Sequence, residues 1–361
     1  MKLSNGVVRA GHTWSEIVQQ PEVWPTTLAR VDQAVAQYGL ASKLAGARVL
    51  LTGAGTSAYA SAAVAAGWPG AMAVASTDLL VDTERLLADA TVVISVARSG
   101  NSPESMATVE RIHRLRPDIL QLAITCNAEG SLARSSEVQA IVLDPRTDDK
   151  SLVMTSSFSN LVLAGYTLAD RAGVEAVLPA ACANASACFD EIDSAAKRVA
   201  NSVKDRIVLL ASSPLFAWAQ EGALKALEMT AGRYPVLAET FLGLRHGPMS
   251  FLGCDTVVVC LLSNAPIRRR YELDLVEELR KKELGFLVGV GATGDEAYLF
   301  DEHLPAIVAE GADELRVPFE IVGAQLLGYH LSLRSGLDPD NPSVDGVINR
   351  VVHGVRIYGE P

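Results

Sequence analysis

The stretch Arg48-Val-Leu-Leu-Thr-Gly-Ala-Gly-Thr-Ser57 decides the fold of this chain. It joins a short apolar run to a glycine-rich turn and then to an alanine-rich segment, a pattern typical of a buried strand that passes directly into a helix. Further apolar runs follow, with helical stretches between them. We expect strands at 48–52, 71–75, 91–95, 120–125 and 140–143. Uninterrupted apolar strands that alternate with helices predict a parallel sheet covered on both faces.

The second half of the chain repeats this pattern. Arg206-Ile-Val-Leu-Leu-Ala-Ser-Ser-Pro-Leu215 aligns with the opening stretch. Thr256-Val-Val-Val-Cys260 aligns with Thr91-Val-Val-Ile-Ser95, at an offset that differs by only a few residues. Two pairs of matching segments, separated by nearly the same number of residues, predict a duplicated α/β architecture.

The repeat divides the 361 residues into four parts. We expect an N-terminal helical arm at 1–44, α/β domains at 45–177 and 178–340, and a C-terminal tail at 341–361. Within the arm, Thr13-Trp-Ser-Glu16 has the pattern of a capping box. Pro25 predicts a bend between two short helices, because proline disrupts a helix interior.

Composition narrows the class of protein. The hydrophobic content of 49% can bury a large core, and the net charge of −11 without a basic stripe disfavours nucleic acid or an anionic membrane as a partner. Five cysteines without CxxC or metal-ligand spacing indicate reduced thiols, and we expect no metal and no cofactor. The N-terminus lacks the apolar core of a signal peptide, and the uncharged run 59–76 is broken by Gly67-Trp-Pro-Gly70. We therefore expect a cytoplasmic protein that does not span a membrane.

The first candidate binding motif is Gly53-Ala-Gly55-Thr56-Ser57, between a strand and a helix. Glycines at such a turn let backbone N–H groups and a helix N-terminus approach an anion. A dinucleotide fingerprint would place a third glycine at position 58, which is alanine, so a nicotinamide cofactor is disfavoured. A strand-to-helix turn without any ligand is the structural alternative.

The second motif is Arg98-Ser99-Gly100-Asn101-Ser102, again where a strand ends and a helix begins. Ser102 suits the N-cap position and Pro103 the first helical position. A guanidinium and two hydroxyls near a positive helix end predict a phosphate cradle. A third hydroxyl cluster, Thr155-Ser156-Ser157, starts a helix that we expect to run to residue 170, and a simple N-cap explains it almost as well.

The third motif combines acid/base residues. Glu221, Lys225 and Glu228 share one face of a predicted helix, and His246 follows eighteen residues after Glu228 in Gly243-Leu-Arg-His246-Gly-Pro248. A carboxylate, an ammonium and an imidazole together can move protons on a sugar. The structural alternative is a solvated helix face that carries an i,i+4 ion pair.

These motifs, in this order, resemble the sugar isomerase (SIS) domain family over nearly the whole chain. The segments 13–21, 98–105, 243–248 and 349–358 are most similar to the galactosamine-6-phosphate deaminase/isomerases, formerly labelled tagatose-6-phosphate ketose/aldose isomerases. The resemblance implies two flavodoxin-like domains, each with a five-stranded parallel sheet flanked by helices. It also implies a homodimer with shared active sites and an amino-sugar phosphate as the substrate.

The resemblance further implies roles for single residues. Ser57, Ser99 and Ser102 match the phosphate-binding hydroxyls, and Arg98 adds charge where the synthase relatives have glutamine. Glu228 matches the base that moves a proton between C2 and C1, Lys225 its electrostatic partner, and His246 the ring-opening histidine supplied by the neighbouring subunit. Glu221 is left with a structural role. Further substrate-binding candidates are Gly55, Thr56, Asn101, Thr155, Ser156 and, in place of the synthase tail lysine, Arg350 or His353.

The function implied is conversion of galactosamine 6-phosphate to tagatose 6-phosphate and ammonia. Two alternatives stay open. One is a phosphosugar aldose/ketose isomerase without deamination, which no residue here separates from a deaminase. The other is a non-catalytic phosphosugar sensor, which would keep the phosphate cradle but lack the acid/base helix. The sequence also does not distinguish galactosamine from glucosamine 6-phosphate.

Overall fold

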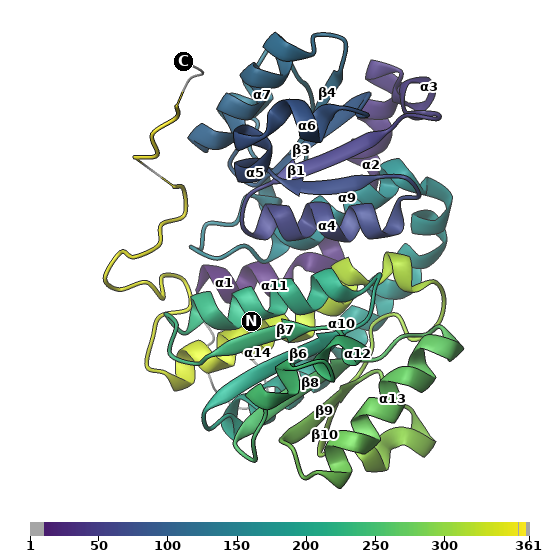
Figure 1. Ribbon diagram of the computed structural model, residues 1–361, viewed down its shortest axis with the longest axis vertical. Coiled ribbons are helices and arrows are strands. Elements are labelled where there is room, and N and C mark those ends of the chain that lie inside the picture. The colour runs from purple at the N-terminus through teal and green to yellow at the C-terminus, as the bar shows by residue number, and fades with distance from the viewer. Residues whose placement is uncertain (1–10, 353, 359–361) are drawn as a thin grey trace.

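The computed structural model describes residues 11–352 and 354–358, and it contains two parallel five-stranded sheets separated by a double layer of helices (Figure 1). The first sheet has the order β2-β1-β3-β4-β5. Its strands are β1 (Val49–Gly53), β2 (Met72–Ala75), β3 (Val92–Ala97), β4 (Leu120–Thr125) and β5 (Gln139–Val142). The five strands expected from the apolar runs are therefore confirmed.

The second sheet has the order β10-β9-β8-β6-β7. Its strands are β6 (Arg206–Ala211), β7 (Val236–Glu239), β8 (Thr256–Leu261), β9 (Phe286–Val290) and β10 (Glu302–Leu304). In both sheets the first strand lies between the second and the third, and the fourth and fifth follow outward. The sequence repeat thus corresponds to a structural repeat, and the predicted pair of α/β domains is confirmed.

Helices cover both faces of each sheet, as fully buried central strands require. The described α-helices are α1 (His12–Val18), α2 (Gln20–Tyr38), α3 (Leu40–Leu44), α4 (Thr56–Gly67), α5 (Ser76–Val81), α6 (Thr83–Leu87), α7 (Pro103–Leu115), α8 (Ser131–Arg134), α9 (Ser156–Ala169), α10 (Arg171–Ser202), α11 (Phe216–Met229), α12 (Phe241–Leu244), α13 (Pro266–Lys281) and α14 (Val317–Arg334). Between the sheets, α4 and α9 of the first domain pack against α11 and α14 of the second. This contact brings the two repeats together.

Helix α10 carries the chain from the first domain to the second, and the boundary expected at 177/178 falls inside it. By length and composition, it is the one helix among the described residues that could cross a membrane. It packs, however, against α2, α9 and α14 and carries charged residues on its exposed side. We interpret it as a connecting helix.

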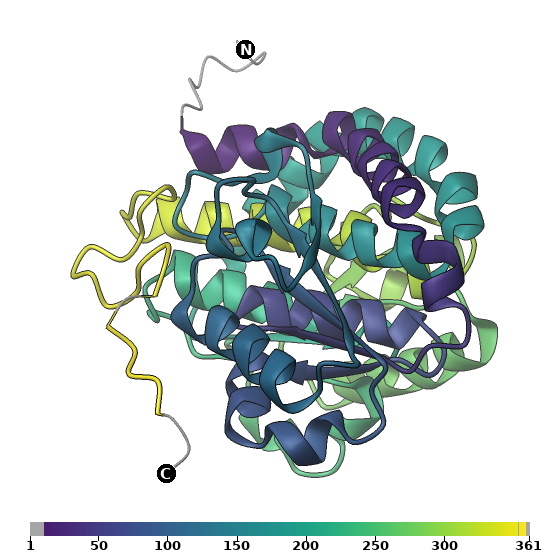
Figure 2. The same cartoon turned by 90° about the horizontal axis from the view of Figure 1, so that it is seen from above.

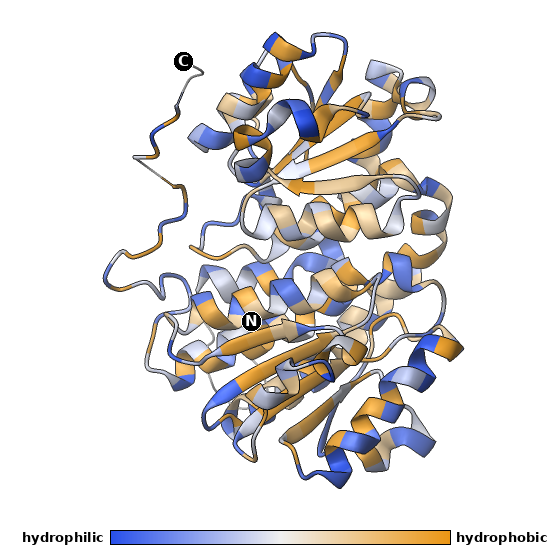
Figure 3. Ribbon diagram, viewed as in Figure 1, coloured by the Kyte–Doolittle hydropathy of each residue, from blue (hydrophilic) through white to orange (hydrophobic). Residues whose placement is uncertain are grey.

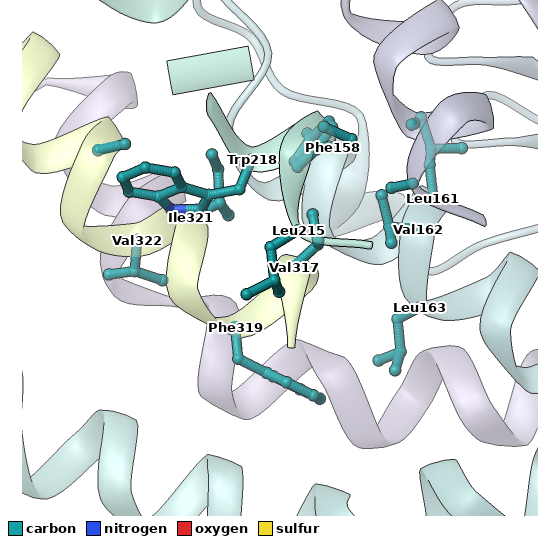
Figure 4. Close-up of a cluster of buried hydrophobic side chains, with 14 of the residues drawn as sticks. Phe158, Leu161, Val162, Leu163, Leu215, Trp218, Val317, Phe319, Ile321 and Val322 are labelled. Carbon is teal, nitrogen blue, oxygen red and sulfur yellow. The ribbon is translucent and has the colours of Figure 1, made fainter. Parts of the chain in front are cut away.

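One large hydrophobic cluster is shared by the two domains. It contains Phe158 from α9, Trp218 from α11 and Phe319 from α14, which lie close together in Figure 4. Trp24 of α2 packs edge-on against Phe319 with ring centroids 5.0 Å apart. The strands are mostly apolar, as the colouring of Figure 3 shows. Because this core is common to both repeats, it fixes α4 relative to α11.

A buried ion cluster stabilises the start of α14. Arg316 is fully buried, and its Nη1 donates to Asp313 Oδ1 at 2.8 Å and to the carbonyl of Leu262 at 2.9 Å. Its Nε lies 3.4 Å from Glu320 Oε1. The charged hydrogen bonds offset the cost of burying the guanidinium, and they tie the end of β8 to α14.

The predicted bend at Pro25 is wrong. Helices α1 and α2 meet at Gln19, and Pro25 lies inside α2. Trp24 and Thr27, on either side of the proline, are both fully buried. Their packing on the core holds helical geometry through this position, and tertiary contacts here outweigh the local preference of proline.

The predicted capping box is also wrong. The first N–H groups of α1, on His12 and Thr13, donate to the two carboxylate oxygens of Asp340, at 2.7 Å each. The Thr13 hydroxyl donates to the carbonyl of Pro339 instead of capping its own helix. Glu16 is buried and accepts hydrogen bonds from the turn that follows β5. The cap of α1 therefore comes from the C-terminal end of the chain.

Candidate active site

The two glycine- and serine-rich turns meet at one edge of the first sheet. They follow β1 and β3, which are adjacent. After β1 the chain continues to β2 on one side of this pair, and after β3 it continues to β4 on the other side. Open α/β sheets bind ligands outside the carboxyl ends of their strands at such a switch point. Ser57 begins α4, and Ser99 and Ser102 follow β3. The structure thus places the three predicted phosphate-binding hydroxyls at this edge.

The turn after β1 requires its glycines. A Cβ atom on Gly53 would lie 2.7 Å from the backbone of Ser57, too close for any side chain. Gly55 has a φ of +57° and stands at the N-cap of α4. The Ser57 side chain is largely buried, with 6% of the residue exposed, and its hydroxyl makes no hydrogen bond within the described part of the chain.

The turn after β3 is braced by its neighbours. Ser102 caps α7 as predicted, because its Oγ accepts from the N–H of Ser105 at 3.2 Å. Asn101 Oδ1 accepts from the N–H of Ser131 at 2.9 Å, which links the turn to α8. The Ser99 hydroxyl, which is partly exposed, accepts only from the N–H of Asn101, at 3.3 Å. Of this motif, Ser99 is the hydroxyl with the fewest internal bonds.

Arg98 uses its guanidinium differently from the prediction. Its Nη1 lies 3.1 Å from the carbonyl oxygens of Ser151 and Leu152, and its Nη2 donates to the carbonyl of Arg350 at 2.8 Å. The side chain is buried, and burial lowers its pKa from the ordinary value. The guanidinium is therefore bound to the backbone of two distant segments, and a phosphate would have to compete with these carbonyls.

The hydroxyl cluster at the start of α9 lies in the interior. Asp149 Oδ2 accepts from the N–H groups of Thr155 and Ser157, at 2.8 Å each, and from the Ser157 hydroxyl at 2.5 Å. Burial, followed by the charge of Glu16, raises the pKa of Asp149 to about 6. Thr155 and Ser156 are fully buried, so neither side chain is open to a ligand in this structure.

The acid/base residues of α11 form a buried cluster against α4. Glu221 and Lys225 are fully buried, and Lys225 Nζ lies 2.5 Å from Glu228 Oε2 and 3.3 Å from Glu221 Oε1. Thr56 Oγ1 lies 3.2 Å both from Lys225 Nζ and from Glu221 Oε1. The alternative of a solvated helix face is therefore wrong. Only Glu228, with 22% of its side chain exposed, connects this cluster to solvent.

Protonation in this cluster follows from one ammonium facing two carboxylates. Burial raises the pKa of Glu221 to about 8, against the opposing attraction of Lys225. Burial lowers the pKa of Lys225, but the two carboxylates outweigh it and the net shift is upward. The two shifts agree if Lys225 keeps its charge and Glu221 holds a proton below about pH 8.

Tyr59 is a neighbour of this cluster that the sequence analysis missed. It lies one turn after Thr56 on α4, and it is partly buried. Burial, followed by the charges of Glu221 and Glu228, raises its pKa. The i,i+3 spacing from Thr56 could have indicated it, because residues three apart share a helix face.

The structure does not bring every candidate to this edge. His246 follows α12 and is exposed, and it makes no side-chain hydrogen bond or ion pair with another described residue. Arg350 donates from Nε to the carbonyl of Asp149 at 2.8 Å and pairs with Asp148 at 2.5 Å. His353 lies outside the described residues.

Glu228 faces a cavity of about 480 Å³ between the end of α11 and the C-terminal tail. Most of its lining is apolar. The lining residues are Leu224, Leu227, Glu228, Ala231, Gly232, Leu337, Pro342, Ser343, Val344, Asp345, Val347 and Ile348. A carboxylate on the wall of an apolar cavity and paired with a buried ammonium is well placed to exchange protons with a bound molecule.

No protein-family model matches the chain. It is 36% identical to the D-galactosamine-6-phosphate deaminase AgaS of Shewanella sp. (strain ANA-3), with 96% of this chain and 91% of that protein aligned. It is 32% identical to the D-galactosamine-6-phosphate deaminase AgaS of Escherichia coli, with 96% of each aligned. The crystal structure of tagatose-6-phosphate ketose/aldose isomerase from Escherichia coli superposes with a TM-score of 0.85, at 28% identity and 97% coverage of both chains.

Proposed function

The chain belongs to the D-galactosamine-6-phosphate deaminase family, and from this premise we propose that it converts galactosamine 6-phosphate to tagatose 6-phosphate and ammonia. The observation that carries the proposal is the buried Lys225 between Glu221 and Glu228, with Glu228 alone open to a cavity. A phosphosugar sensor has no need to bury an ammonium between two carboxylates, because doing so is costly. We place this enzyme in the cytoplasm.

The phosphate binds, in this proposal, at the switch point between β1 and β3. The Ser57 hydroxyl and the N-terminus of α4 approach it from one side, and the Ser99 and Ser102 hydroxyls from the other. A helix N-terminus and several hydroxyl donors suit a dianion. This end of the site fixes the sugar so that C1 and C2 extend toward α11.

His246 opens the sugar ring, by taking the proton of the anomeric hydroxyl and protonating the ring oxygen. We propose that it does so in the active site of a second subunit, because it is exposed and makes no side-chain hydrogen bond or ion pair with the site residues that the structure describes. The protein would then act as a homodimer with shared sites.

Glu228 then takes the C2 proton of the open aldehyde and returns a proton to C1. O1 takes a proton from the 2-ammonium group of the substrate, so that the intermediate is an enolamine in which C1 and C2 share a double bond. The Lys225 ammonium stabilises the negative charge that develops at O1 during this transfer. Protonation at C1 gives a 2-imine, and addition of water releases ammonia and leaves the ketone of tagatose 6-phosphate.

The test is to incubate the protein separately with galactosamine 6-phosphate, glucosamine 6-phosphate and a neutral aldose phosphate, and to measure ammonia and ketose phosphate together. We expect equal amounts of the two products from galactosamine 6-phosphate. Ketose phosphate formed from a neutral aldose phosphate, without ammonia from either amino sugar, would establish the plain isomerase instead. Tight binding of phosphosugars without any turnover would establish the sensor.

The assignment of Glu228 has its own test. Glu228→Gln keeps the shape of the side chain but removes the base, so we expect substrate binding to persist while turnover falls by at least about a thousandfold. Glu191→Gln, on the exposed face of α10, is the matched control and should leave turnover unchanged. Near-normal activity of Glu228→Gln would remove Glu228 as the base.

A further inference from the structure

The C-terminal tail, described for residues 335–352 and 354–358, has no helix or strand in these ranges and runs along one side of both domains (Figures 1 and 2). It is attached at two places. At the first, Asp340 caps α1 with its carboxylate and accepts from the N–H of Leu152 with its carbonyl, at 2.9 Å. At the second, Arg350 binds Asp148 and the carbonyl of Asp149. Both attachments therefore reach the same turn, residues 148–153.

Between these attachments, the segment 342–348 forms one wall of the cavity that contains Glu228. Its own hydrogen bonds are local, for example from the N–H of Ile348 to the Ser343 hydroxyl at 3.1 Å. Pro342 and Ser343 are buried, whereas Val344 and Val347 are 75% and 85% exposed, so packing on the protein body holds the start of the segment and contributes little beyond it. The position of the wall beyond Ser343 therefore depends on the two attachments.

Arg98 connects the second attachment to the phosphate turn. It is the first residue of the turn 98–102 and immediately precedes Ser99. Its guanidinium spans the gap between the carbonyls of 151–153 and the carbonyl of Arg350. Two N–H groups in a fixed plane can hold two segments at once, which the single ammonium of a lysine does not reproduce.

We propose that Arg98 is a positioning residue. Its guanidinium holds the tail at the carbonyl of Arg350, and we call this contact the clasp. The clasp keeps the wall 342–348 against Glu228 while phosphate orders the turn 98–102. This inference rests on the proposed binding of phosphate at Ser99 and Ser102. It connects the phosphate end of the substrate to the end that reacts. A substrate that carries the phosphate orders the turn, the turn holds Arg98, and Arg98 closes the cavity in which the proton is moved.

Arg98→Lys tests the clasp, because lysine keeps the charge but loses the planar pair of donors. We expect kcat to fall at least about tenfold, while inhibition by inorganic phosphate weakens less than about threefold. We also expect inorganic phosphate to slow tryptic cleavage after Arg350 in the unmodified protein and to lose this effect in the variant. Arg134→Lys, at an exposed arginine of α8, is the matched control and should change none of these values.

The opposite pattern would overturn the clasp. If phosphate inhibition were lost in Arg98→Lys while cleavage after Arg350 stayed normal, Arg98 would be a direct phosphate ligand. Should Arg98→Lys fail to fold, Asp148→Asn removes the half-exposed ion pair of Arg350 and leaves Arg98 intact. We expect faster cleavage after Arg350 and a lower kcat in this variant too, and an unchanged tail would contradict the proposal.

The protease experiment also separates this inference from the proposed function. It needs only inorganic phosphate and no turnover. If no amino-sugar phosphate is converted by the unmodified protein, the proposed function fails, whereas phosphate-dependent protection of Arg350 that requires Arg98 still supports the clasp. Full deaminase activity without such protection would overturn the clasp alone.

Discussion

Replacing Glu221 by glutamine should make the stability of this protein less sensitive to pH. Burial raises the pKa of Glu221 from 4.5 to about 8 in the folded chain. Between these values the folded protein holds a proton that the unfolded chain releases, so the free energy of unfolding falls as the pH rises toward about 8. The full difference corresponds to about 5 kcal/mol. Because Lys225 and Glu228 can redistribute charge around it, we expect about 2 to 5 kcal/mol.

The pH window of this effect distinguishes it from that of Lys225. The stability that comes from the raised lysine pKa is fully present below the ordinary value of 10.5 and is lost only as the pH rises through the higher folded pKa, so Lys225 adds no pH dependence near neutrality. Glu221→Gln keeps the shape of the side chain and cannot ionise. Its stability should therefore equal or exceed that of the unmodified protein at about pH 9 and fall below it, if at all, only at about pH 5.

The measurement is urea unfolding followed by tryptophan fluorescence at several pH values between about 5 and 9. Trp218 lies in the same helix as Glu221 and is buried, so it reports on this region. Glu191→Gln on the exposed face of α10 should unfold in parallel with the unmodified protein. Parallel curves for Glu221→Gln as well would show that Glu221 is ionised in the folded protein, and the reasoning would be wrong.

Two further substitutions test the turn after β1 and the buried ion cluster at the start of α14. Gly53→Ala places a Cβ 2.7 Å from the backbone of Ser57, and we expect a loss of about 1 to 3 kcal/mol in unfolding free energy together with weaker inhibition by inorganic phosphate. Gly253→Ala, where no atom lies within 4 Å and φ is not positive, should be nearly neutral, and equal effects of the two would refute the steric argument. Arg316→Met leaves the buried Glu320 without its cation and removes one of the two arginines that pair with Asp313, and we expect about 3 to 5 kcal/mol of destabilisation by the same unfolding assay. A change below about 1 kcal/mol would show that the buried ion cluster does not stabilise the start of α14.

The sheets could be predicted from the sequence because each strand is an unbroken apolar run. The strand expected at 120–125 matches β4 residue for residue, and the repeat revealed the second sheet. The arm could not be predicted in the same way. Pro25 and the Thr13 to Glu16 pattern carry local preferences, but buried tryptophan and a distant aspartate determine the observed geometry. Local sequence preferences did not predict the structure where contacts between residues far apart in the sequence outweighed them.

The candidate site shows the same division. Helical spacing placed Glu221, Lys225 and Glu228 on one face, but it could not show that this face is buried against Thr56, 169 residues before Lys225. The residue type of Arg98 suggested an anion-binding site. Nothing in the sequence indicates that backbone carbonyls of residues 151–153 and 350 already occupy its guanidinium. Spacing identifies which residues share a face, and only the packing of other elements shows what that face meets.

The cap on α1 has a consequence for the order in which this chain can fold during synthesis. The N–H groups that begin α1 are satisfied by Asp340, 328 positions further on from His12. Helix α1 is therefore completed by a segment that is synthesised much later than the helix itself. Until then, α1 keeps unsatisfied donors at its start, and a short helix of this kind is marginal without tertiary support. Translation must proceed 328 residues beyond His12 before this contact can form.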